Sequence, residues 1–190
     1  MVTEGAMYML PYFMQVSWKM GMFECAAYFC VVSVVSFAVS MFIGKYCDFH
    51  STKKPVMLSF LSAVVFNVLF VFLEPGWSPF VLLVSMVLVG VSFTVFEAAQ
   101  SLRIIRNTER RYRDEAATMI IVLTYIGASF GLIAYCLVLN IAVPETIGAS
   151  IDTLLPSQMT AGFQATGVLG LVLSLCGMAV AAVVTGKEEF

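Results

Sequence analysis

Five long apolar stretches limit this chain to one kind of architecture. Each is close to the roughly 20 residues that a helix needs to cross about 30 Å of hydrocarbon. Inside a bilayer only helices and closed barrels satisfy all of their backbone hydrogen bonds. Barrel strands alternate apolar and polar residues, whereas the stretches AVVFNVLFVFL and FVLLVSMVLVGV are apolar at nearly every successive position. We therefore predict an all-α, polytopic transmembrane bundle with spans at about 22–43, 56–74, 79–100, 116–139 and 163–185.

A sixth apolar stretch, AMYMLPYFMQVS at 6–17, is too short to cross a bilayer alone and contains Pro11. Proline removes a backbone donor and disfavours a helix interior. We interpret this stretch as a partial helix, the end of a span whose beginning is missing. The connection from Pro144 to Thr160 is polar and is expected to be an exposed loop.

The composition agrees with a membrane protein. Hydrophobic residues make up 61% of the 190 residues and charged residues 12%, against roughly 25% charged in a soluble globular domain. A chain of this length is expected to form one domain, 1–190, whose outer surface is solvated by the lipid bilayer. The net charge of -2 gives no bulk attraction to nucleic acid.

The distribution of Lys and Arg predicts the orientation in the membrane. Cytoplasmic connections carry an excess of these residues. Alternating five spans puts Lys19 alone on one side and nine basic residues on the other, which predicts a cytoplasmic C-terminus. The sequence carries no signal that separates a plasma membrane from a vacuolar-type membrane. The nine are Lys45, Lys53, Lys54, Arg103, Arg106, Arg110, Arg111, Arg113 and Lys187.

The residues that usually build catalytic or metal centres are scarce. His50 is the only histidine, and it lies in a polar connection. The five cysteines lie within or at the edges of apolar stretches, where free thiols pack as small apolar residues. The sequence therefore predicts no enzyme activity, no metal site and no cofactor. These cysteines are Cys25, Cys30, Cys47, Cys136 and Cys176.

The connection GKYCDFHSTKK, after the first full span, contains Gly44, Asp48 and the basic pair Lys53 and Lys54. Glycine permits close approach at a helix end, and aspartate can bond exposed amides or oppose the positive end of a neighbouring helix. Two interpretations are open. The segment is either a latch at the cytoplasmic face or a plain turn that the lysines hold inside.

This connection resembles a degenerate form of the G-x-x-x-D-R-x-G-R-K loop of the major facilitator superfamily. Phe49 stands where the family has Arg, and Ser51 where it has Gly. Upstream, YMLPYFMQ, which ends at Gln15, resembles the Tyr-x-Leu-Pro-x-x-x-Gln helix end of the fourteen-span drug:proton antiporters. The order of partial helix, span, motif loop and four further spans extends the resemblance over nearly the whole chain.

The resemblance implies the C-terminal half of a transporter that exchanges drugs or other small organic solutes for protons. Such transporters contain two bundles of six helices with the solute held between them. One bundle with a shortened first helix implies a truncated or split product, a chain that needs a second transporter half, or a dimer of itself. The alternative is a membrane scaffold or assembly subunit that does not transport.

Glu97 and Gln100 lie at the predicted cytoplasmic end of the third span. An ionisable group at membrane depth costs several kcal/mol unless it is paired or hydrated. Glu97 is therefore expected either to carry a proton or to form a structural ion pair with Arg103 or Arg106.

Other polar residues lie deeper in the spans. Asn67 lies in the second span and Tyr125, beside Thr124, in the fourth. Such groups are expected to face protein or a cavity rather than lipid. Together with Glu97, Gln100 and Gln15, they are the candidates for a proton or solute path.

Small residues in two spans predict close helix packing. Gly127 and Gly131 form a GxxxG step, which puts two glycines on one helix face and lets another helix approach. The last span has the same small-residue character. Its glycines are Gly162, Gly167, Gly170 and Gly177.

Overall fold

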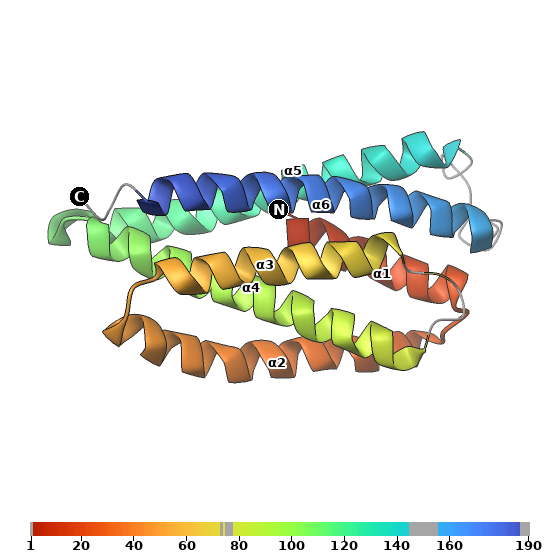
Figure 1. Ribbon diagram of the computed structural model, residues 1–190, viewed down its shortest axis with the longest axis horizontal. Coiled ribbons are helices and arrows are strands. Elements are labelled where there is room, and N and C mark those ends of the chain that lie inside the picture. Colours follow the sequence, from red (N-terminus) through yellow and green to blue (C-terminus); the bar gives the residue numbers. More distant parts are fainter. Residues whose placement is uncertain (1, 73, 75–77, 145–155, 187–190) are drawn as a thin grey trace.

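The computed structural model describes residues 2–72, 74, 78–144 and 156–186 (Figure 1). In this part of the chain, all regular secondary structure is helical. The elements are α1 (Val2–Ser17), α2 (Met22–Phe49), α3 (Lys53–Val71), α4 (Pro79–Asn107), the short 3-10 helix η1 (Arg110–Tyr112), α5 (Arg113–Ala142) and α6 (Pro156–Gly186).

The prediction of an all-α, multi-pass membrane protein is confirmed. Helices α2 to α6 are long and apolar enough to cross a bilayer. Several of them extend beyond the apolar stretches, since α2 ends at Phe49 and α4 at Asn107. Helical hydrogen bonding continues there into polar sequence. The loop expected at 144–160 lies mostly outside the described residues, and its last part belongs to α6.

The helices pack in pairs that reveal an internal repeat. Helix α3 packs against α6, α2 against α4, and α1 against α5. Exchanging the first three helices for the last three leaves these three pairs unchanged and exchanges α3–α4 with α1–α6, whereas the α5–α6 contact has no comparable counterpart between α2 and α3. Because each unit has an odd number of helices, the two units run in opposite directions, as the course of the chain in Figure 1 shows. The bundle is therefore an inverted pair of three-helix units.

Helix α1 is the main departure from this symmetry. It has 16 residues, whereas α4, its counterpart in the second unit, has 29. At 1.5 Å per residue, α1 is about 24 Å long and falls short of a bilayer's hydrocarbon core. It begins near the middle of the bundle and runs towards the end opposite the C-terminus (Figure 1).

The core of the bundle forms around α1. Leu10, Phe13 and Met14 are almost fully buried. The ring of Phe13 lies 4.8 Å from that of Phe163 on α6 and 6.4 Å from that of Phe70 on α3, measured between centroids. The partial helix predicted at 6–17 is therefore a central packing element.

Glycines permit the closest helix contacts. A β-carbon on Gly90 of α4 would lie 3.2 Å from the carbonyl oxygen of Val32 on α2. On α6, a β-carbon on Gly167 would lie 3.1 Å from a side-chain carbon of Val71, and one on Gly177 would overlap the ring of Phe60. The predicted packing role of the small residues in the last span is therefore confirmed.

Serine hydroxyls join α3 to α4 inside the apolar interior. Ser62 donates a hydrogen bond to the carbonyl of Leu88 at 2.9 Å, and Ser92 donates one to the carbonyl of Ser59 at 3.0 Å. Such interhelical bonds hold membrane helices together where no hydrophobic driving force acts between them.

Helices α2 and α5 are the least buried of the five long helices. They occupy equivalent places in the two three-helix units, and much of each apolar surface faces away from the rest of the chain. Those surfaces are available to lipid or to another protein.

Candidate functional site: a cavity inside the bundle

A cavity of about 440 Å³ lies between α3, α4, α5 and α6. It is formed by the first half of α3 and α5 and the second half of α4 and α6, so it lies in the half of the bundle nearer the basic connections. Its walls combine aromatic and aliphatic residues with a group of polar side chains. The polar residues are Ser59, Ser92, Glu97, Gln100, Ser101, Thr124 and Ser174.

The cavity occupies the part of the bundle that α1 does not fill. Near the beginning of α1, a β-carbon on Gly5 would lie 2.7 Å from the ring of Tyr135 and 3.1 Å from the carbonyl oxygen of Gly131 on α5. Gly127, one turn before Gly131 in α5, lines the cavity. Helix α1 packs in one half of the bundle, and the cavity lies in the other.

A buried polar cluster lies next to the cavity. The side-chain amide of Asn67 donates to the carbonyl of Ala63 at 2.8 Å and to the hydroxyl of Ser174 at 3.1 Å. Its Oδ1 atom and the hydroxyl of Tyr135 have no hydrogen-bond partner among the described residues, although both side chains are fully buried. A β-carbon on Gly170 would overlap both atoms, so the two lie close together. Asn67 faces protein, as predicted.

Glu97 and Gln100 both line the cavity, as expected for candidates for a solute path. Glu97 is exposed at the surface of the bundle. Its predicted structural ion pair with Arg103 or Arg106 is not found in the described part of the chain. Arg106 instead lies beside Asp48.

The other path candidates lie elsewhere. Tyr125 is 70% exposed on the outer face of α5, so its side chain is turned away from the rest of this chain. Its neighbour Thr124 lines the cavity instead, because successive helix residues differ by about 100° in direction. Gln15 is half-buried on α1 and is not among the residues that line the cavity.

The two glycines of the GxxxG step have different neighbours. Gly131 is buried, and its carbonyl contacts the first turn of α1, as the packing prediction requires. Gly127 lines the cavity. The step therefore packs against a helix at one glycine and borders open space at the other.

The segment from Gly44 to Lys54 is mostly helical. Gly44 lies inside α2, and a β-carbon there would have nothing within 4 Å. The prediction that Gly44 permits close approach at a helix end was therefore wrong. Lys53 and Lys54 form the first turn of α3, where positive charge opposes the helix dipole. Their position gives α3 no electrostatic stabilisation and instead fits a role in membrane orientation.

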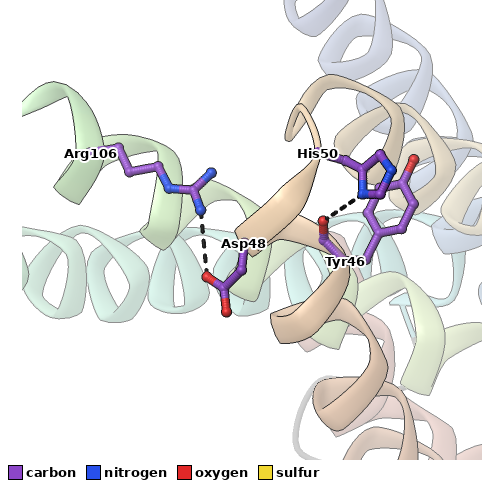
Figure 2. Close-up of polar contacts among 4 residues, drawn as sticks. All are labelled: Tyr46, Asp48, His50 and Arg106. Atoms are coloured by element: carbon purple, nitrogen blue, oxygen red, sulfur yellow. Dashed lines mark hydrogen bonds and ion pairs between the residues drawn. The ribbon is translucent and has the colours of Figure 1, made fainter.

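Asp48 connects the ends of two helices. Its Oδ1 atom lies 3.5 Å from a guanidinium nitrogen of Arg106, near the end of α4 (Figure 2). Both side chains are largely exposed, so the pair contributes at most about 1 kcal/mol. Beside it, the ring of His50 stacks on Tyr46 with centroids 4.6 Å apart. The predicted latch residue is thus joined to a neighbouring helix through an arginine.

Sequence reasoning missed several residues of the site. Ser59, Ser92 and Ser174 line the cavity, and Tyr135 contributes a buried hydroxyl. The serines follow helical spacing within apolar spans, for example Ser85 and Ser92 in α4. That spacing indicates a polar helix face. It does not indicate which helix the face contacts.

Fold and cavity together define a multi-pass integral membrane protein whose helix bundle contains a mostly apolar cavity with several polar side chains in its wall. No group of three or more His, Cys, Asp or Glu in the described residues could hold a metal ion. Comparison with protein-family models, curated proteins and solved structures gave no match.

Proposed function

We propose that this chain is one half of a facilitator-type membrane transporter and moves small organic solutes in exchange for protons. It supplies one helix bundle, and the opposing bundle comes from a second transporter half or from a second copy of the chain. On this proposal the ends that carry the basic connections, including the C-terminus, are cytoplasmic.

The inverted pair of three-helix units is the observation that carries this proposal. Secondary transporters are commonly built from inverted repeats, and each bundle of a facilitator-type transporter contains a 3+3 inverted repeat. The pairs α1 with α5, α2 with α4 and α3 with α6 have that symmetry. A bundle built only for packing has no need of it.

The outer face of α5 also supports a partner bundle. Tyr125 lies near the middle of α5 and is 70% exposed. A phenol hydroxyl in hydrocarbon finds no hydrogen-bond partner, which is costly. A second bundle or a hydrated path against this face would supply that partner. The equivalent helix of the first unit, α2, is also turned outward.

A transport assay tests the proposal directly. The chain is expressed in cells, and accumulation of a labelled small organic cation is compared with a vector control, with surface expression verified. We expect altered accumulation that a protonophore abolishes. If Asp48 is a latch, Asp48→Asn changes the rate and leaves the amount of protein unchanged, because the exposed pair with Arg106 adds little stability.

Photo-crosslinking separates a half-transporter from a scaffold or an isolated bundle if the chain alone does not transport. Benzoylphenylalanine replaces Tyr125, and the control replaces Leu61, which is exposed on α3. We expect Tyr125 to crosslink to a second copy or to another multi-pass protein and Leu61 to crosslink to lipid. Crosslinking of both positions to lipid alone, with no transport, would contradict the proposal.

A further inference from the structure

The hydroxyl groups around the cavity have little capacity left to donate hydrogen bonds. Ser59 donates to the carbonyl of Val56 at 2.7 Å, and Thr124 donates to the carbonyl of Ile120 at 2.9 Å. Ser174 donates to the carbonyl of Gly170 at 2.7 Å. Ser92 is committed to α3 in the same way. Each hydroxyl oxygen still has a lone pair, so these groups act as acceptors towards a ligand while the bonds to the helix carbonyls are kept.

The remaining polar groups reinforce this excess of acceptors. Glu97 contributes a carboxylate, and no cation in the described part of the chain is paired with it. The Oδ1 atom of Asn67, whose amide donates to Ser174, is buried and accepts no hydrogen bond from the described residues. Gln100 and Ser101 retain donors of their own, but both lie on α4 towards the basic end. The deeper part of the cavity therefore favours a ligand that donates hydrogen bonds, and Glu97 favours positive charge at its exposed edge.

Aromatic rings supply the rest of the wall. Phe60, Phe93 and Phe96 line the cavity, and the rings of Phe60 and Phe96 meet edge to face with centroids 5.4 Å apart. Aromatic faces attract cations and also pack against apolar groups. A volume of about 440 Å³ lies within the range of small-molecule sites, roughly 300 to 1,000 Å³.

The contacts between α4 and α5 are sparse beside the cavity. Glu97 on α4 and Leu123 on α5 line the cavity and are also exposed at the surface of the bundle. A small molecule can therefore reach the carboxylate from outside the bundle.

We propose that this cavity binds a protonated amine carried on a small aromatic or aliphatic body. The ammonium group donates hydrogen bonds to the carboxylate of Glu97 and to the hydroxyl oxygen of Thr124, and the apolar body lies against Phe60 and Phe96. The site lies within one bundle, so binding requires no partner half. That this amine is a transported solute rests on the proposed function. That the cavity binds it does not, and binding is tested without transport.

Equilibrium binding to the purified chain in phosphatidylcholine nanodiscs tests this proposal. The probes are labelled 2-phenylethylamine, which is protonated at pH 7, and 2-phenylethanol, which has a similar shape and no charge. We expect the amine to bind more tightly. Glu97→Gln should weaken amine binding about tenfold or more, because hydrogen bonds to charged groups are the stronger class, and should leave alcohol binding unchanged.

The matched control is Glu109→Gln, which removes the same charge from an exposed residue in the connection between α4 and α5. It should leave amine binding unchanged. Equal binding of amine and alcohol, or an equal effect of the two substitutions, would overturn the proposal. These results do not depend on transport, so failure here is distinct from failure of the proposed function.

A steric variant covers the case in which Glu97→Gln does not fold. Gly127 lines the cavity and its neighbour Ala128 does not. Gly127→Val should abolish binding of both probes, whereas Ala128→Val should not, and equal binding by the two folded variants would overturn the assignment of this cavity. Displacement of the amine by phosphatidylethanolamine in the nanodisc would assign the site to a lipid headgroup and overturn the small-solute proposal.

Discussion

Gly170 is surrounded by polar atoms inside an apolar bundle. The side-chain Oδ1 atom of Asn67 and the hydroxyl of Tyr135 both lie where a β-carbon on Gly170 would be, and Ser174, one turn away, accepts a hydrogen bond from the Asn67 amide. The sequence predicts a small residue in α6 and a polar group in α3 that faces protein. It does not predict that they meet, since that depends on the rotation and register of two helices about 100 residues apart.

Substituting Gly170 should therefore be far more damaging than an ordinary helical Gly→Ala change. In Gly170→Ala the new methyl group overlaps the side chains of Asn67 and Tyr135. We expect destabilisation of about 1–3 kcal/mol, the usual cost of overpacking, measured as the free energy of unfolding in mixed detergent micelles with increasing dodecyl sulfate.

Gly44→Ala is the control for that experiment. Nothing lies within 4 Å of a β-carbon at Gly44, which is inside α2. Alanine there should stabilise the protein by up to about 1 kcal/mol through helix propensity alone. Similar effects of the two substitutions would show that Gly170 does not determine the α3–α6 contact.

At the level of elements, length and apolarity predict every long helix, because lipid imposes that length on any span. Helix ends are less predictable. Gly44 and the polar residues after it are expected in a connection but continue α2, since nothing in that sequence forces the helix to stop. The central position of α1 could not be read from the sequence, because its apolar residues would look the same at a lipid-facing surface.

The packing of α1 gives a second prediction. Phe13→Ala should destabilise the bundle by about 3–5 kcal/mol, the range for removing a buried Phe side chain, because its ring contacts both Phe70 and Phe163. The same unfolding titration measures this. Tyr12→Ala, on the exposed side of α1, should cost less than about 1 kcal/mol, and an equal loss in both variants would contradict a central role for this face.

For the whole molecule, the charge distribution and the fold agree. The connections between α2 and α3 and between α4 and α5 lie at the same end of the bundle as the C-terminal end of α6 (Figure 1). That arrangement gathers most of the basic residues at one end and leaves Lys19 at the other. The sequence predicts this division because spans must alternate. It does not predict the cavity, which depends on how α3, α4, α5 and α6 pack against one another.

The orientation itself is testable by cysteine labelling in intact cells. The five native cysteines are replaced by alanine, and a single cysteine replaces either Lys19 or Lys54. An impermeant maleimide should label the first variant directly and the second only after permeabilisation, because basic connections are retained in the cytoplasm. The reverse pattern would invert the proposed topology.

The packing partners of α1 have a consequence for how the chain is made. Helix α2 is long and apolar enough to cross the bilayer, so it is stable in lipid until α4, which packs against it, has been synthesised. The helices that bury α1, namely α5 and α6, are synthesised after the other described helices. At about 5–20 residues per second, the nascent chain carries an unassembled apolar segment for many seconds. Membrane quality control can act on the protein until α6 leaves the ribosome.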